Sequence, residues 1–243
     1  MKKILILTLT ALLPVLLLQE NLGAQEDVYD ELGQSHSVEI PADSPYAQVD
    51  VVRSSAAIHI LLGDNSVLKK AQISEIIQNA ENYAPPVFYL LSFALFEDDQ
   101  KDEAMFWFYA GQLRGRYDAN RCADKSAGAA ISELNAQFGP AVNRYAFQDL
   151  DKLEKTVLKV LEWDRRTPHS YDHRWINLHG MEAMISLLEV QEGKVAVEDI
   201  VMSRPESEWE EIFRQTQETY LTGFKEVLKM MQERQGGGLY NGE

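Results

Sequence analysis

Residues 85–115, PPVFYLLSFALFEDDQKDEAMFWFYAGQLRG, decide the fold. The two prolines at the start suit the first turn of a helix, where a proline sacrifices no hydrogen bond. The residues that follow, as far as Phe96, are apolar on nearly every side, which is typical of a helix buried among neighbours; the run is too short to span a bilayer. Residues 98–101 form a polar turn, and Asp102 can cap a second helix rich in aromatic side chains. The stretch therefore predicts a helical hairpin at the centre of a core.

Helical patterns precede and follow this hairpin. Ser44 before Pro45 is typical of a helix start, and apolar residues recur close to a 3.6-residue period as far as Leu61. Gly63 predicts the end of that helix, and residues 64–66 can cap the next one. A helix of small residues from Ala123 to Phe138 should end at Gly139-Pro140.

The second half of the chain shows the same kind of periodicity. An amphipathic stripe predicts a helix over 147–163, which Thr167-Pro168 should end. Residues 176–190 predict another helix, with Gly193 as its stop. Two consecutive capping boxes, Ser203 with Glu206 and Ser207 with Glu210, predict that a long last helix begins near 205–208. We expect an all-α fold in which helical hairpins pack into a single irregular or solenoid-like domain over residues 44–235.

The N-terminus has the three-part pattern of a secretory signal peptide. Lys2 and Lys3 precede a nearly unbroken apolar run, and small residues lead to a cleavage site after Ala24. Residues 25–43 predict a flexible acidic lead-in with a short strand as an option near Val38, and residues 236–243 predict a loose tail. We expect an exported protein, periplasmic or secreted, with residues 1–24 removed; an uncleaved N-terminal anchor is the alternative.

The net charge limits the classes of molecule that the protein could bind. The net charge of the chain is −15, and removing the leader would make it −16. Such acidity disfavours nucleic acid and anionic lipid surfaces, so we expect no nucleic-acid partner and no stable membrane insertion after cleavage. A protein partner with a basic surface would suit the charge.

Cys122 is the one cysteine, so no internal disulfide can form, and a small buried thiol is the simplest interpretation.

The central hairpin resembles one unit of the tetratricopeptide and Sel1-like helical-repeat families over residues 85–111. On the first helix, Phe88, Leu91 and Ser92 follow the pattern of bulky, apolar and small residues, with Leu95 where an aromatic is usual. On the second helix, Ala104, Phe108 and Gly111 follow the pattern of small, aromatic and small residues. The resemblance implies close helix packing and suggests a protein-binding role. The family's closing proline is replaced by Arg116, and residues 45–82 lack the pattern.

A polar and aromatic stretch, residues 163–179, contains three of the five histidines. Imidazoles and a carboxylate suit a divalent metal, so His169, Asp172, His173 and His179 could converge on one. The alternative is a helix-capping loop, in which Asp172 or Asn177 caps the next helix and the arginines face the end of the previous one. Cys122 with His173 or His179 could also form a thiol–imidazole pair.

A second candidate site is a group of mostly basic residues, from 114–121 and 165–174, in an otherwise acidic chain. Its members could form a binding patch for anions or carboxylates; the alternative is that they pair with local acids across helix ends. Both interpretations concern Arg114, Asp118, Arg121, Arg165, Arg166 and Arg174.

The common catalytic motifs are missing from the sequence. There is no phosphate-binding glycine loop, dinucleotide fingerprint, HExxH, GxSxG or CxxC. The sequence thus predicts no catalytic residue, metal ligand or cofactor. We expect an exported, non-catalytic helical interaction protein: a scaffold, an envelope-assembly factor or an immunity-type binding protein. The alternative is a metal-dependent hydrolase or a ligand-binding protein that uses the 163–179 loop.

Overall fold

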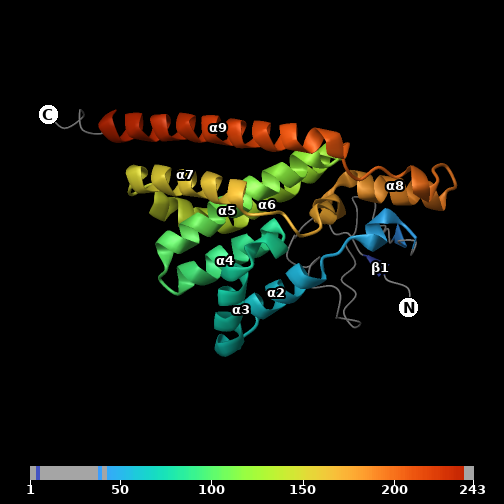
Figure 1. Cartoon of the computed structure of the whole chain (residues 1–243), viewed down its shortest axis with the longest axis horizontal. Helices are drawn as coiled ribbons and strands as arrows, with labels where there is room; N and C mark the ends of the chain where they lie inside the picture. Colours follow the sequence, from blue (N-terminus) through green and yellow to red (C-terminus); the bar gives the residue numbers. More distant parts are fainter. Residues whose placement is uncertain (1–3, 6–37, 40–42, 238–243) are drawn as a thin grey trace, which may run out of the picture.

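The computed structural model describes residues 4–5, 38–39 and 43–237 (Figure 1). Within these ranges the protein is an all-α single domain, as expected, apart from one antiparallel pair of two-residue strands, β1 (Ile4–Leu5) and β2 (Val38–Glu39). The α-helices are α2 (Val52–Leu62), α3 (Ser66–Gln78), α4 (Pro85–Glu97), α5 (Lys101–Arg121), α6 (Ala129–Ala146), α7 (Leu150–Arg166), α8 (Met181–Gln191) and α9 (Trp209–Gly237).

Short 3-10 helices connect several of these elements: η1 (Pro45–Gln48), η2 (Ala80–Asn82), η3 (Lys125–Gly128), η4 (His173–His179), η5 (Val197–Asp199) and η6 (Glu206–Glu208). The predicted leader and acidic lead-in lie outside the described residues except for the two strands, and the predicted tail lies outside them except for the end of α9. In the part of the chain that is described, no helix combines the length and the apolar content that a bilayer crossing requires.

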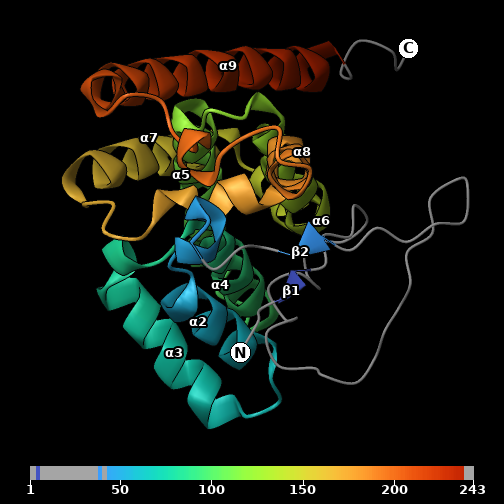
Figure 2. The ribbon, with the colours of Figure 1, turned by 90° about the vertical axis from the view of Figure 1, so that its right-hand side faces the viewer.

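Helix α5 is the centre of the fold and contacts α4, α6, α7 and α9. Figures 1 and 2 show α9 along one side of the molecule and the α2–α3 pair at the opposite side. The α4–α5 hairpin packs closely because its contact residues are small: Ser92 Oγ donates to the Ala104 carbonyl at 2.6 Å, and a Cβ on Gly111 would lie 3.0 Å from the Tyr89 ring. The predicted hairpin at the centre of the core is confirmed.

One expected helix is interrupted, and one expected cap is wrong. Ser44 does cap a helix, with its Oγ accepting from the Tyr46 amide at 3.3 Å, but that helix is the short η1. The helix predicted from Ser44 to Leu61 is broken, because Val49 is extended and the Asp50 carboxylate accepts from the Val52 amide, which opens α2. Asp102 does not cap α5, which begins at Lys101. Its carboxylate accepts instead from Tyr145 Oη at 2.6 Å and Lys152 Nζ at 3.0 Å.

The predicted helix end at Gly139-Pro140 is also wrong, since α6 continues through both residues. Buried side chains recur on one face before and after the proline, from Leu134 to Val142, so packing against the core holds the helix together. Gly139 lies against Phe108, where a Cβ would be 3.2 Å from the ring. The glycine therefore permits close packing here and does not end the helix.

Three helix boundaries in the second half of the chain also differ from the prediction. Helix α7 starts at Leu150, with Asp149 Oδ1 accepting from the Lys152 amide, and not at Phe147. Residues 176–179, predicted as the start of an α-helix, belong to η4. Ser203 does not cap α9, which begins at Trp209; its hydroxyl pairs with His173 Nε2 at 2.8 Å.

Candidate functional site

The two polar segments singled out by the sequence come together in the fold. Arg114, Asp118 and Arg121 lie at helical spacing on α5, and the chain after α7 wraps around that face. The result is a buried polar cluster, which we define as Arg114, Asp118, Arg121, Asp164, His169, Tyr171 and Trp175. Its members are paired with one another over sequence separations of up to 57 residues.

Arg114 and Asp164 form the first half of this cluster. Both side chains are removed from water, at 0% and 2% exposed. Arg114 Nε donates to Asp164 Oδ1 at 2.9 Å, its Nη2 donates to the Thr167 carbonyl at 2.8 Å, and its guanidinium lies 4.4 Å from the Trp163 ring centroid.

Two further side chains complete the environment of the Asp164 carboxylate. His169 Nε2 lies 2.8 Å from Oδ1, and Gln217 Nε2 donates to Oδ2 at 2.9 Å. Burial alone would raise the pKa of Asp164, but His169 and Arg114 outweigh it and hold the pKa below its usual range. The carboxylate is therefore ionised at neutral pH, and both of its oxygens are hydrogen-bonded.

In the second half of the buried polar cluster, Asp118 is the hydrogen-bond acceptor, and it is 0% exposed. Its Oδ1 accepts from Arg121 Nη2 at 2.7 Å, and its Oδ2 accepts from Tyr171 Oη at 3.0 Å and Trp175 Nε1 at 2.8 Å. The Arg121 guanidinium also lies 4.4 Å from the Tyr117 ring centroid. Such pairing ties η4 to α5 and leaves Asp118 little capacity for a ligand.

The remaining residues of the 163–179 stretch have separate partners. Asp172 caps η4 by accepting from the Arg174 amide at 3.0 Å, and it also accepts from the Asp50 amide. Arg174 pairs with Asp172 at 2.7 Å. His173 packs against Trp209, with ring centroids 4.7 Å apart, and His179 lies beside Trp175. Arg165 and Arg166 are exposed, and Arg166 pairs with Glu162 on its own helix.

The four residues considered for a metal do not share one centre in the structure, since His169 faces Asp164 and His173 faces Ser203. Among the described residues, no group of three or more histidine, cysteine or acidic side chains is arranged to hold a metal ion. Cys122 is 3% exposed, and burial raises the pKa of its thiol to about 11, so the thiol is protonated at neutral pH.

The side chains that cap α8 were not predicted from the sequence. Its N-cap is Gly180, which has no side chain to accept the free amides of the first turn. Asp124 and Ser126, from the η3 region, do this instead: Asp124 Oδ2 accepts from the Glu182 amide at 3.0 Å, and Ser126 Oγ accepts from the Met181 amide at 2.8 Å. Asp124 also caps η3, where its Oδ1 accepts from the Ser126 amide at 2.8 Å.

A cavity of about 600 Å³ lies beside this junction. It is bounded by η1, η3, η4, α8 and the segment 195–201, which contains η5. Its walls are mostly polar and include Tyr46, Asp124, Lys125, Ser126, Asn177, Glu182, Ser186 and Asp199. No stretch of sequence signals this cavity, because its walls come from segments far apart in the chain.

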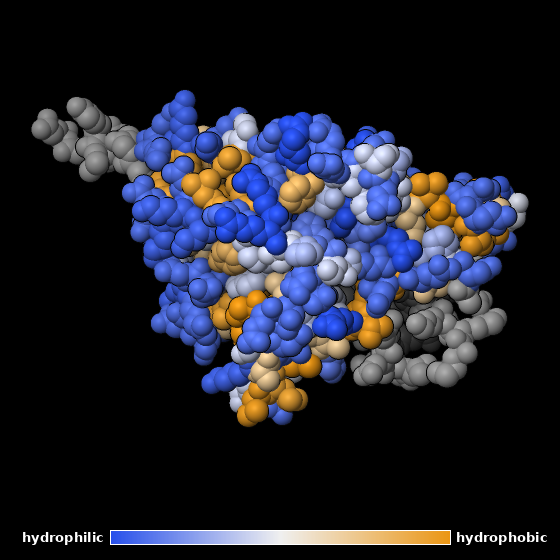
Figure 3. Space-filling model, in the orientation of Figure 1, coloured by the Kyte–Doolittle hydropathy of each residue, from blue (hydrophilic) through white to orange (hydrophobic). Residues whose placement is uncertain are grey.

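Helix α8 also presents an apolar stripe to solvent. We define the α8 stripe as Met181, Ile185 and Leu188, which are 61%, 41% and 37% exposed. The opposite side of the helix, with Ala183 and Leu187, packs in a small second core. Figure 3 shows orange atoms gathered on the α8 end of the molecule.

Comparison with family models, with curated proteins and with solved structures gave no match for this chain. The tetratricopeptide-like and Sel1-like pattern of residues 85–111 therefore stays a prediction from those residues alone.

Proposed function

We propose that this chain is an exported, non-catalytic helical protein that binds a protein partner through the α8 stripe. The observation that carries the proposal is the spacing of three exposed apolar side chains at i, i+4 and i+7 on one helix face. Contiguous apolar surface of this kind is typical of a face that another helix covers. The export part rests on the leader pattern of residues 1–24.

The charge around the α8 stripe favours a basic partner. Within α8, Glu182 and Glu189 are charged and no lysine or arginine occurs. An amphipathic helix with an apolar row and flanking lysines or arginines would complement both features. The repeat-like pattern of residues 85–111 agrees with a binding role, and the internal pairing of the candidate polar residues agrees with a non-catalytic one.

The proposal is tested by placing a photoreactive amino acid at position 185 in the cells that produce the protein. Leu158 on α7 is the matched control, since it is 45% exposed against 41% for Ile185. We expect a discrete crosslinked adduct from position 185, recovered with chains that begin at Gln25, and no such adduct from position 158. Equal yields at both positions, or no adduct at either, would contradict the proposal.

A further inference from the structure

Helix α3 is apolar on two opposite sides. Ile73 and Ile76 pack against the core, and Ile76 is 0% exposed. On the outer side, Val67, Leu68 and Ile77 are 75%, 53% and 42% exposed, and Figure 3 shows orange atoms at the lower end of the molecule, over α3. The main contacts of α3 are with α2 and η2. An apolar outer side of this kind is typical of a helix that a partner covers.

The charge of α3 is opposite to that of α8. Lys69 and Lys70 outnumber Glu75 in α3, whereas α8 carries two glutamates and no lysine or arginine. Glu75 is itself paired with Arg53 of α2 at 3.6 Å, and among the described residues neither lysine forms an ion pair. Helix α3 is therefore a cationic element in a chain whose net charge is −15.

The exposed apolar residues of α3 share their surface with one of these lysines. We define the α3 face as the exposed residues Val67, Leu68, Lys70, Ala71 and Ile77. Lys70 is three residues from Val67 and seven from Ile77, which places it on the same side of the helix. The α3 face thus combines an apolar surface with a flanking cation, which are the two features that a partner of the α8 stripe needs.

Helical geometry also matches the flanks of the two surfaces. At 3.6 residues per turn, Glu182 and Glu189 lie together on one flank of the α8 stripe. If α3 faces α8 in the parallel orientation, Lys70 falls on that same flank; in the antiparallel orientation it falls on the other. Charge therefore favours a parallel pair of helices.

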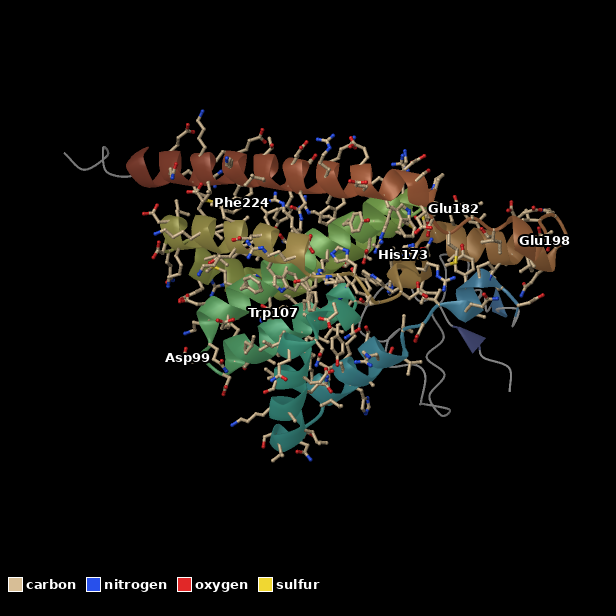
Figure 4. The ribbon with its side chains drawn as sticks, in the orientation of Figure 1. Asp99, Trp107, His173, Glu182, Glu198 and Phe224 are labelled. Carbon is tan, nitrogen blue, oxygen red and sulfur yellow. The ribbon has the colours of Figure 1, made fainter. Side chains whose placement is uncertain are left out.

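Within one molecule, α3 and α8 lie too far apart to form this pair. Figures 1 and 2 place the two helices in different parts of the molecule, and Figure 4 shows Glu182 at the start of α8, well separated from α3. A contact between α3 of one copy and α8 of another would be head-to-tail, because it joins two different surfaces and leaves one of each at the ends. Such a contact propagates into open chains or closes into rings.

We propose that the partner of the α8 stripe is the α3 face of a second copy of this chain. The inference rests on the proposed function and names the partner. A contact of one helix with one helix is smaller than the roughly 1,600 Å² of a standard interface, so the association should be weak and reversible.

The test is photocrosslinking of the purified chain without residues 1–24, with the photoreactive amino acid at position 185. We expect a ladder of self-adducts that grows with protein concentration, and peptide mapping should place the second attachment site in α3. Lys70→Glu should lower the yield about tenfold, because it replaces attraction by repulsion beside the glutamates of α8. The matched control is Lys155→Glu, at an exposed lysine of α7, which should leave the yield unchanged.

A charge swap guards against an indirect effect of Lys70→Glu on the fold. Adding Glu182→Lys and Glu189→Lys to the Lys70→Glu chain should restore the ladder, since the two flanks then carry opposite charges again. Self-adducts that map to another element, or that Lys70→Glu and Lys155→Glu affect equally, would overturn the inference.

The purified chain and the producing cells together separate this inference from the proposed function. No self-adduct from the purified chain, with an adduct to a different protein in the cells, would overturn the inference and leave the proposed function standing. No adduct from position 185 in either setting would reject both.

Discussion

At the scale of single residues, the buried polar cluster shows how charged side chains can serve the fold. Arg114 lies wholly inside the protein, and its guanidinium is balanced by Asp164 at 2.9 Å. Burying either charge alone is expensive, whereas the pair with its hydrogen bonds is tolerated. Their hydrogen bonds join α5 to α7, and both oxygens of Asp164 are hydrogen-bonded.

Asp164→Asn should therefore lower the free energy of unfolding by about 3–5 kcal/mol, because it leaves Arg114 buried without a counter-charge. The double variant Arg114→Met with Asp164→Leu should recover much of this loss, since apolar groups of similar size can replace a buried pair. Urea unfolding of a chain without residues 1–24 measures both. The control is Arg166→Gln, at an exposed ion pair, which should change little. An Asp164→Asn variant as stable as this control would show that the buried pair is unimportant.

Two glycines should respond in opposite ways to the same substitution. Gly180→Ala must displace the Asp124 carboxylate that caps α8, and we expect a loss of about 1–3 kcal/mol in unfolding free energy. Gly223→Ala, in the middle of α9 with open space around it, should raise stability by up to about 1 kcal/mol. Thermal unfolding of the two variants checks this. Equal effects of the same sign would refute the role given to Gly180.

At the scale of elements, η4 carries two histidines that the fold keeps neutral. Burial, together with the charge of Arg121, lowers the pKa of His173 to about 4 despite the nearby Asp118 and Asp172; burial lowers that of His179 to about 4. Free imidazole titrates near pH ~6.5, so between these values the unfolded chain binds more protons than the folded one. The stability due to each neutral histidine is thus complete above about pH 6.5 and declines as the pH falls toward about 4.

We therefore expect the unfolding free energy to fall between about pH 7 and pH 5, by on the order of 2 kcal/mol for each histidine. Replacing His173 or His179 with Gln should reduce this pH dependence, whereas replacing the exposed His59 should leave it unchanged. Urea unfolding at several pH values gives the slope. A slope that is the same in all three variants would contradict the prediction. The lowered pKa of Asp164 acts separately, since its contribution is lost only in more acidic solution.

Helix existence could be predicted from the sequence, but helix boundaries often could not. Apolar and aromatic content predicts α4 and α5, and apolar period predicts α7 and α9, because each of these helices buries one or more faces in the core. Pro140 is tolerated inside α6 because packing on both sides of it outweighs the missing hydrogen bond. Ser203 fits a capping box in sequence but is engaged by His173 in the fold. Local signals fail wherever a distant residue provides the partner.

The same limit applies to the candidate site. The alternative in which the arginines pair with acids was open from the sequence, but the actual partner of Arg114 is 50 positions away and could not be identified. The cavity and the capping of α8 by Asp124 had no local signal at all, because their residues are brought together by packing between segments more than 50 positions apart.

At the scale of the whole molecule, one cluster of charged side chains is buried, while one row of apolar side chains on α8 is exposed. The cluster around Arg114 and Asp118 joins α5, α7, η4 and α9, while α8 extends from this body (Figure 1). The three side chains of the α8 stripe are exposed. An acidic molecule with an apolar helix face suits a basic amphipathic partner. This distribution is the physical basis of the proposed function.

The most direct measurement is a photocrosslinking scan along α8, from Met181 to Gln191, in the producing cells. If a partner covers the α8 stripe, adduct yield should follow the helical period, with maxima at Met181, Ile185 and Leu188 and minima at the inward-facing Ala183 and Leu187. A yield that is uniform along the helix, or that peaks on another face, would contradict binding through this surface.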